Sequence, residues 1–570
     1  MIKNFNENLQ RRIENYLLYC NEKEKDTILN AVNLQDFESL EKWFSVDLSF
    51  GTGGLRGKMG IGFSNINEVT ILKAAHATIN FFKDISNRDK KSICISYDTR
   101  KNSSLFAKIS AIVAAKNGFY VYLAPMPLPS PFLSYIIPVT ESICGIMITA
   151  SHNPKEYNGF KVYDETGCQI LEEKQNKIMK IYSAAKYIEK VDLEDFNTLI
   201  NSNKIEFISE ELINKFVEDL CNITFYKNIK MNIRLLNIVY TSLHGTGINI
   251  FRILGKKIGF NVSYVESQIV EDPNFSNVKS LNPENKESLI EAIELGINKN
   301  ADLIVATDPD ADRLALAFKS KNGYFIPDGN EIGVMLFYYI CTQLRLKEIE
   351  HSRHTRFDYY AITTIVTTDL LEIIGKYFGI EIIKTLTGFK YIGNQINLHP
   401  DKKFLFAAEE SYGYLYFDRL RDKDSFSTIV LALELTSYLK SNNLTAEEYL
   451  QSIYHQFGYY CNEVIYIDLL NDEPEIGIEK LMNNLRDNPP ESIENRKIRK
   501  ILDFKNGYDN LPKSDIIQYF GENFKITIRP SGTEPKLKIY VQVVSQNKKE
   551  SKELLETFKN FFIYQIKLMQ

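Results

Sequence analysis

Three aspartates occupy alternate positions in one short loop. Asp308, Asp310 and Asp312 follow the apolar run LIVAT, so we expect them at the end of a buried strand. Crowding three carboxylates is costly unless a cation offsets their charge, and all-oxygen ligands suit Mg²⁺. A calcium EF-hand loop would need glycine and glutamate where Arg313 and Lys319 stand. The pattern favours a magnesium site over a solvated acidic loop, and the arginine adds a donor suited to phosphate.

A serine follows another apolar run. Ser151 lies in the segment TASHNP, directly after ICGIMIT. A serine at a strand end can act as a nucleophile or accept a phosphoryl group. The alternative is that Ser151 and Asn153 only cap a turn or a helix. The segment does not fit the GxSxG signature, so a hydrolase nucleophile elbow is not supported.

Two glycine-containing loops carry an arginine. In RPSGTEP, Arg529, the hydroxyls of Ser531 and Thr533 and the backbone at Gly532 could bind an anion, although an ordinary hairpin turn would have the same composition. GTGGLRG fails both the Walker A and the dinucleotide-binding patterns. It remains a flexible loop with one cation, Arg56, again suited to phosphate.

Adjacent carboxylates and a hydroxyl follow the apolar run FLFA. Glu409 and Ser411, in the segment EESYG, could hydrogen-bond vicinal sugar hydroxyls, or could cap a helix instead. Lys161 and Lys390, each in a GFK segment, and His244 in HGTG are further polar candidates. A single lysine or histidine of this kind is more often plain surface.

These segments must be positioned by a scaffold of alternating strands and helices. Short β-branched apolar runs recur between amphipathic stretches of helical length, which predicts α/β domains with largely parallel sheets. Open α/β sheets bind ligands at the carboxyl ends of their strands, where the polar loops fall. The last part differs, because two strand patterns flank SGTEP and a helix follows, which indicates a small α+β unit.

Domain boundaries are faint, because no long linker interrupts the chain. At about 150 residues per domain, 570 residues suggest about four domains. We expect a helical N-terminal extension, then domains with the serine loop, the aspartate loop, the EESYG loop and the RPSGTEP loop. Their expected ranges are 1–45, 46–205, 206–325, 326–455 and 456–570.

Composition excludes several classes of protein. With 68 basic and 73 acidic residues the net charge is −5, which argues against nucleic acid as the partner. Seven scattered cysteines do not indicate a disulfide framework. No signal-peptide core or membrane-length apolar run is apparent, so we expect a cytoplasmic protein with no membrane partner. The oligomeric state and the role of 351–360 stay open.

Taken together, the motifs resemble the α-D-phosphohexomutase superfamily, most closely its phosphoglucomutase-2-like branch of phosphoglucomutases and phosphopentomutases. The matching text is GTGGLRG, TASHNPKEYNGFKVY, TDPDADRLA, TGFKYIG, EESYGY and RPSGTEPKLKIY, in the expected order over about residues 50–540. The resemblance implies three related mixed α/β domains and a smaller C-terminal α+β domain around a central cleft. It also implies Mg²⁺ and an active-site phosphoserine.

The resemblance further implies a role for each matching residue. Ser151 would be the phosphoserine and, with Asp308, Asp310 and Asp312, a metal ligand. Lys161 would be an acid/base candidate beside Arg56 and His152. The residues implied in sugar or phosphate binding are Glu409, Ser411, Lys390, Arg313, Arg100, Arg529, Ser531, Gly532 and Thr533.

The activity implied is the interconversion of glucose 1-phosphate and glucose 6-phosphate. Phosphorylated Ser151 would give its phosphoryl group to the sugar phosphate, and the resulting glucose 1,6-bisphosphate would turn over before the serine is rephosphorylated. The base is open, since Lys161 could serve only if its pKa were lowered.

Other activities remain as alternatives. Pentose and mannose phosphates allow the same chemistry. A metal-dependent phosphatase of the haloacid dehalogenase type would use Asp308 as nucleophile, and a non-enzymatic sugar-phosphate-binding protein would need neither the serine nor the metal loop.

Overall fold

The computed structural model describes residues 6–51, 54–185, 188–223, 232–351, 358–468, 474–531 and 536–569. These residues form two compact units. The first comprises residues 1–319, 389–400 and 413–437, and the second comprises the remainder. Several predictions lie outside the described residues, namely those for Gly532 and Thr533, part of the GTGGLRG segment and most of 351–360.

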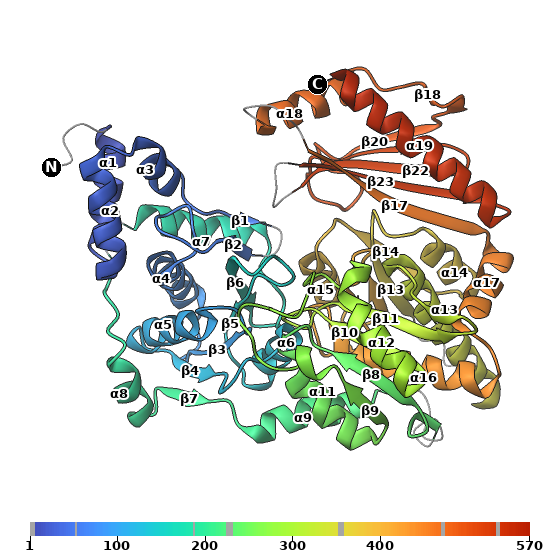
Figure 1. Cartoon of the computed structure of the whole chain (residues 1–570), viewed down its shortest axis with the longest axis horizontal. Helices are drawn as coiled ribbons and strands as arrows, with labels where there is room; N and C mark the ends of the chain where they lie inside the picture. The colour runs from blue at the N-terminus through green and yellow to red at the C-terminus, as the bar shows by residue number, and fades with distance from the viewer. Residues whose placement is uncertain are drawn as a thin grey trace. The chain divides into compact units, whose positions relative to one another are not determined.

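The first unit begins with the expected helical extension, α1 (Glu7–Leu17), α2 (Glu22–Leu34) and α3 (Phe37–Phe44). Its helices are amphipathic, and Ile13, Tyr16 and Phe44 are buried in a small core of their own. This core includes Val69 from the first turn of α4 (Glu68–Ile85), so the extension packs on the first domain. Figure 1 shows α1 to α3 in blue beside that domain.

The sheet of the first domain has the strand order β1-β2-β6-β5-β3-β4-β7. β5, β3, β4 and β7 run parallel, whereas β1, β2, β6 and β5 pair antiparallel. The strands are β1 (Phe50–Gly51), β2 (Gly54–Lys58), β3 (Ser92–Tyr97), β4 (Tyr120–Leu123), β5 (Cys144–Ile148), β6 (Tyr157–Asp164) and β7 (Ile205–Phe207). The other helices are α5 (Ser103–Lys116), α6 (Ser130–Val139), α7 (Glu172–Ala184) and α8 (Asp195–Asn201).

The second domain contains β11, β10, β8 and β9 in this order, with β8 parallel to both β10 and β9 and β11 antiparallel to β10. The strands are β8 (Asn237–Thr241), β9 (Asn261–Tyr264), β10 (Leu303–Thr307) and β11 (Leu314–Ser320). The helices are α9 (Glu210–Cys221), α11 (Gly247–Ile258), η1 (Glu266–Gln268), η2 (Lys286–Leu289) and α12 (Ile290–Lys299). β10 is buried along its whole length, as its unbroken apolar sequence predicts. α15 (Phe389–Leu398), β16 (Tyr414–Leu415) and most of α16 (Ser425–Ser441) complete this unit.

The second unit contains most of the third domain and all of the fourth. β13 is parallel to β14 on one side and to β15 on the other. The second unit begins with the short strand β12 (Gly323–Phe325). The third-domain elements are α13 (Gly329–His351), β13 (Tyr359–Thr364), α14 (Leu370–Phe378), β14 (Glu381–Thr385), β15 (Lys403–Ala408) and α17 (Ala446–Phe457).

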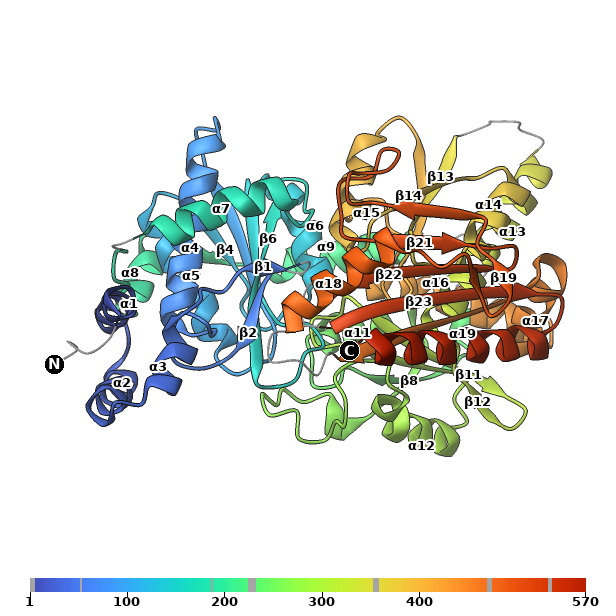
Figure 2. The ribbon, with the colours of Figure 1, turned by 90° about the horizontal axis from the view of Figure 1, so that it is seen from above.

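The fourth domain is an antiparallel sheet of order β17-β23-β22-β21-β20 with helix α19 along it, as Figure 2 shows. Its elements are β17 (Tyr459–Asp468), α18 (Pro474–Asp487), β18 (Ser492–Ile493), β19 (Arg496–Lys497), β20 (Lys500–Asp503), β21 (Ile517–Phe520), β22 (Phe524–Pro530), β23 (Lys536–Ser545) and α19 (Lys548–Met569). A buried polar cluster ties it to the third domain. Lys525 and Gln542 donate to the two oxygens of Asp369, each at 2.7 Å.

The expected fold class is confirmed as three α/β domains followed by a smaller α+β domain. The sheets are less parallel than the strand–helix alternation predicts. β2 and β6 add an antiparallel edge, because short connections rather than crossover helices join β1 to β2 and β5 to β6. In the part of the chain that is described, no helix is long and apolar enough to cross a membrane.

Candidate active site

The aspartate loop lies between β10 and β11 and is buried. One carboxylate oxygen from each of Asp308, Asp310 and Asp312 lies within 4.8 Å of the others, so the three could hold a metal ion together. The loop passes close to the backbone at Gly245, where a Cβ atom would lie 2.4 Å from the Cα of Pro309. This close approach requires glycine in the HGTG segment and explains its place in the sequence.

The free oxygens of this loop fit a hard divalent cation. Asp310 Oδ1 and Asp312 Oδ1 are buried and have no hydrogen-bond partner among the described residues. Leaving two buried carboxylate oxygens unpaired is costly unless they bind a cation. In contrast, Asp308 Oδ1 accepts from the backbone amides of Asp312 at 3.0 Å and Arg313 at 2.9 Å, which leaves its Oδ2 for the site.

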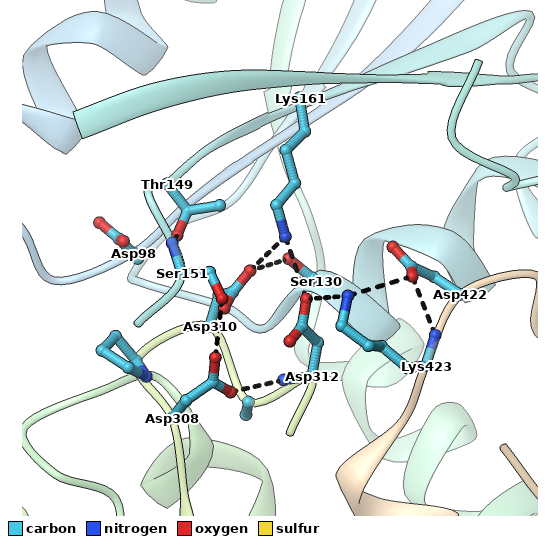
Figure 3. A network of polar contacts seen from close by, with 12 residues as sticks. Asp98, Ser130, Thr149, Ser151, Lys161, Asp308, Asp310, Asp312, Asp422 and Lys423 are labelled. Atoms are coloured by element: carbon cyan, nitrogen blue, oxygen red, sulfur yellow. Dashed lines mark hydrogen bonds and ion pairs between the residues drawn. The ribbon is translucent and has the colours of Figure 1, made fainter. Parts of the chain in front are cut away.

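Two lysines bind the other oxygens of the loop (Figure 3). Lys161 Nζ lies 2.6 Å from Asp310 Oδ2 and 3.0 Å from Asp312 Oδ2, and Lys423 Nζ lies 2.8 Å from the same Asp312 oxygen. Burial would raise the pKa of Asp312, but the charges of Lys161, Lys423 and Arg313 outweigh it and lower the pKa. Burial and the carboxylates of Asp312 and Asp310 raise the pKa of Asp308 well above its usual value.

Lys161 does not meet the condition set for a base. Burial disfavours its charged form, yet Asp310 and Asp312 outweigh this and raise the pKa of Lys161 above its ordinary value. The side chain is therefore held as an ammonium group, able to donate hydrogen bonds and to offset negative charge. The sequence indicated the residue correctly as a polar candidate but could not give the direction of this shift.

The serine meets the aspartate loop directly. Ser151 Oγ donates to Asp308 Oδ2 at 2.9 Å and lies 3.2 Å from His152 Nδ1. Ser151 has φ of +52° and is almost fully buried. Its amide donates to Thr149 Oγ1 at 2.8 Å, which stabilises this left-handed backbone locally. A left-handed backbone at a buried serine is typical of a functional residue rather than a plain turn.

Arg100 shapes the loop that carries the serine. Its guanidinium donates to the carbonyls of Ser151 at 2.5 Å, Pro154 at 2.8 Å, Tyr157 at 3.0 Å and also Asn153. Its Nε lies 3.2 Å from Asp98 Oδ2, and both side chains are fully buried. These bonds to backbone indicate a positioning residue for the serine loop.

Replacing Arg100 by lysine should lower kcat about 100-fold, because one ammonium cannot bind four carbonyls and the serine hydroxyl would shift. Steady-state kinetics should show little change in KM. Arg88→Lys is the matched control, since Arg88 is exposed and donates to the carbonyl of Glu141 at 2.5 Å. A raised KM with normal kcat would instead assign Arg100 to substrate binding.

Three further residues stand around the serine. Arg56 Nη1 donates to Asn153 Oδ1 at 3.3 Å, and its buried Nε has no hydrogen-bond partner among the described residues. Burial and the positive charges of Arg313 and Arg56 lower the pKa of His152 well below its usual value, so its imidazole is neutral. Arg313 pairs with Glu284 at 2.5 Å.

Lys390 lies elsewhere in the first unit. It is buried on α15, and its Nζ is 2.7 Å from Glu172 Oε1 and 3.4 Å from Gln175 Oε1, both on α7. His244, the remaining single candidate, is buried, and its Nδ1 is 2.9 Å from the carbonyl of Val270. Neither residue is plain surface.

The other predicted loops belong to the second unit. Glu409 follows β15, and its Oε1 accepts from the amide of Gly388 at 2.9 Å. Ser411 is half-buried beside it. Arg529, on β22, donates to Tyr540 OH at 2.8 Å, and the Ser531 amide donates to the carbonyl of Lys536 at 2.8 Å.

Sequence reasoning missed three residues of the cluster. Lys423 reaches Asp312 from a loop far along the chain, and Asp422 beside it is buried. Ser130 Oγ donates to Asp310 Oδ2 at 2.7 Å. The only available signal was RDKD (421–424), a charged run directly before the apolar helix α16. Nothing in the sequence marks Ser130.

Comparison with known proteins gives the family. Models of the four phosphoglucomutase/phosphomannomutase domains match in order, the three alpha/beta/alpha domains at 47–189, 214–322 and 328–457 and the C-terminal domain at 482–556. The chain therefore belongs to the phosphoglucomutase/phosphomannomutase family, within the α-D-phosphohexomutase superfamily.

Individual relatives cover nearly the whole chain. It is 35% identical over 550 residues to a phosphoglucomutase of Staphylococcus haemolyticus, covering 94% of this chain and 96% of the relative. It is 35% identical over 524 residues to a phosphoglucomutase of Staphylococcus aureus strain MSSA476, covering 88% and 91%. The open form of the parafusin phosphoglucomutase from Paramecium has the same fold, with a TM-score of 0.69 and 20% sequence identity. The match covers 92% of this chain and 95% of the Paramecium chain.

Proposed function

We propose that this protein is a phosphoglucomutase that interconverts glucose 1-phosphate and glucose 6-phosphate through phosphorylated Ser151. The observation that carries the proposal is the 2.9 Å hydrogen bond from Ser151 Oγ to Asp308 Oδ2. It places a hydroxyl beside a cluster of three carboxylates, in which the unpaired oxygens of Asp310 and Asp312 suit a cation. Mg²⁺ held by Asp308, Asp310 and Asp312 would offset charge on the seryl phosphate during transfer.

Phosphoryl transfer at Ser151 requires proton transfers that this cluster can support. In the first half, the sugar hydroxyl oxygen would bond to phosphorus, the bond from phosphorus to Ser151 Oγ would break, and the hydroxyl proton would pass, in net terms, to Ser151 Oγ. In the second half these changes reverse with the other phosphate of the bound 1,6-bisphosphate. Neutral His152, 3.2 Å from Ser151 Oγ, can exchange a proton there. Lys161, held as an ammonium group, offsets charge on the transferring oxygens.

The remaining predicted residues are assigned to substrate. Glu409 and Ser411 would accept from and donate to sugar hydroxyls. Arg529 and Ser531, together with Gly532 and Thr533, would bind the phosphate that is not being transferred. Arg56, Arg313 and Lys390 would contribute positive charge for the phosphates. We assign the domains to the expected ranges and the chain to the phosphoglucomutase-2-like branch.

Replacing Arg529 by alanine should raise the KM for the sugar phosphate about 10- to 100-fold with a smaller change in kcat, because a charge-assisted contact to the bound phosphate is lost. Initial-rate kinetics would measure this. Arg499→Ala serves as a control, since Arg499 belongs to the same domain and its side chain forms an exposed pair with Glu522 at 2.8 Å. An unchanged KM for Arg529→Ala would remove this residue from the substrate site.

The proposed activity has a direct assay. Purified protein with Mg²⁺ and a trace of glucose 1,6-bisphosphate should convert glucose 1-phosphate to glucose 6-phosphate without releasing inorganic phosphate. Ribose 1-phosphate and mannose 1-phosphate, tested in parallel, would reveal phosphopentomutase or phosphomannomutase activity. Release of free phosphate without isomerisation would favour the phosphatase alternative.

A further inference from the structure

A fourth buried carboxylate lies next to the aspartate loop. Asp422 is 1% exposed, and its Oδ2 accepts from Tyr163 OH at 2.9 Å and from Gln169 Nε2 at 2.7 Å. Its Oδ1 accepts from the backbone amide of Lys423 at 2.9 Å. A buried carboxylate is tolerated when it is this well hydrogen-bonded, and the surrounding donors fix the position of Asp422. We call Asp422, Tyr163 and Gln169 the Asp422 bracket.

The fold brings the two donors together through local sequence. Tyr163 lies two residues after Lys161 on β6, so both side chains project from the same face of the sheet. A tight turn follows, in which the amide of Asp164 donates to the carbonyl of Cys168 at 2.9 Å and Gly167 has φ of +78°. The turn returns the chain so that Gln169 pairs with Tyr163. On one face of β6, Lys161 therefore contacts the aspartate loop and Tyr163 contacts Asp422.

The Asp422 bracket lies next to Lys423, the lysine that forms an ion pair with Asp312. Lys423 follows Asp422 in the chain, and its Nζ lies 2.8 Å from Asp312 Oδ2 and 3.7 Å from Asp422 Oδ1 (Figure 3). Lys423 thus lies between two buried carboxylates. Because the lysines occupy the Oδ2 atoms of Asp310 and Asp312, the Oδ1 atoms are the ones left for a cation.

We propose that the Asp422 bracket consists of positioning residues that set the orientation of the metal-binding carboxylates through Lys423. Fixing Asp422 fixes the lysine, and the lysine holds Asp312 with its Oδ1 turned to the cation site. Residues of this kind, which orient ligands without touching the metal, typically change metal affinity 10- to 100-fold. The proposal depends on the proposed function only in that the aspartate loop binds a divalent cation.

Tyr163→Phe is the mildest test, because it removes one hydroxyl and keeps the ring. Titration of purified protein with Mn²⁺, followed by the loss of the free-ion signal in electron paramagnetic resonance, should give a Kd about 10-fold higher than that of the unchanged protein. Tyr182→Phe is the matched control. Tyr182 is equally buried in the same domain, and its hydroxyl has no hydrogen-bond partner among the described residues. Its Kd should be unchanged.

Asp422→Asn should raise the Kd for Mn²⁺ between about 10- and 100-fold, because the bracket loses its charge. If the bracket acts through Asp422 as one unit, the double variant Tyr163→Phe/Asp422→Asn should bind no more weakly than Asp422→Asn alone. In kinetics, the Mg²⁺ concentration needed for half-maximal rate should rise for both single variants. Saturating Mg²⁺ should restore kcat, and the KM for sugar phosphate should stay unchanged, which a general loss of folding would not produce.

Wild-type Mn²⁺ affinity in Tyr163→Phe would overturn the proposal, as would an equal loss in Tyr182→Phe. If Asp422→Asn does not fold, the comparison of Tyr163→Phe with Tyr182→Phe still tests the proposal. If the wild-type protein binds Mn²⁺ but does not isomerise glucose 1-phosphate, the proposed function is wrong. The Mn²⁺ titrations of the variants still test the Asp422 bracket in that case. Failure of the unchanged protein to bind Mn²⁺ would contradict both.

Discussion

Ser151→Ala is expected to lower the rate of glucose 1-phosphate isomerisation at least about 1,000-fold, because the group that carries the phosphoryl between the two halves of the reaction is removed. The variant should also take up no phosphoryl group when incubated with glucose 1,6-bisphosphate. Binding of Mn²⁺ should persist, since Asp308, Asp310 and Asp312 supply the carboxylates.

Ser110→Ala is the control for this variant. Ser110 is a buried serine of the same domain, and its hydroxyl donates to the carbonyl of Phe106 within α5 at 2.8 Å. Its replacement should leave turnover unchanged. Substantial isomerase activity in Ser151→Ala would show that another group carries the phosphoryl.

Asp310→Asn is expected to weaken Mg²⁺ binding about 100-fold or more and to lower the rate accordingly at limiting Mg²⁺. The change removes one of the three charges that attract the cation. Ser130 Oγ and Lys161 Nζ donate to Asp310 Oδ2 at 2.7 Å and 2.6 Å, so in the variant these two donors would face a neutral amide instead of a carboxylate. Titration of the rate with Mg²⁺, after removal of metal by a chelator, measures the effect.

Asp195→Asn is the control for the loss of a carboxylate. Asp195 lies in an exposed pair with Lys116, at 2.5 Å, and its replacement should leave the Mg²⁺ dependence unchanged. An Asp310→Asn protein with the Mg²⁺ dependence of the unchanged protein would mean that the aspartate loop does not hold the metal.

The meeting of Ser151 and Asp308 could be anticipated from the sequence in general form. Each follows an apolar run, so each is expected at the end of a strand, where open α/β sheets bind ligands. The two strands, β5 and β10, belong to different sheets, so the contact itself depends on how the first two domains pack. The aspartate loop could be predicted as a metal site because its three aspartates are close in sequence, so local spacing alone places their carboxylates together.

What the sequence could not supply depends on contacts between distant segments. Lys423 reaches Asp312 across more than a hundred residues, so no local pattern points to it. The same contact decides the chemistry of the site, because Lys161 and Lys423 lower the pKa of Asp312, and the aspartates raise the pKa of Lys161. The pKa of a buried group follows from neighbours that only the fold brings into contact.

Arg100 shows the same limit in another way. The family resemblance implied that Arg100 binds sugar or phosphate, but its side chain donates to carbonyls of the serine loop. Whether an arginine binds a ligand or the backbone depends on which groups the fold places around it.

The most direct test is to locate the phosphoryl group. The protein, incubated with glucose 1,6-bisphosphate and Mg²⁺ and then digested, should yield one phosphorylated peptide by mass spectrometry, with the modification on Ser151. Subsequent addition of glucose 1-phosphate should remove that phosphoryl group and form bisphosphate. A phosphoryl group on Asp308, or none on Ser151 under conditions in which the protein isomerises the sugar phosphate, would contradict the phosphoserine mechanism.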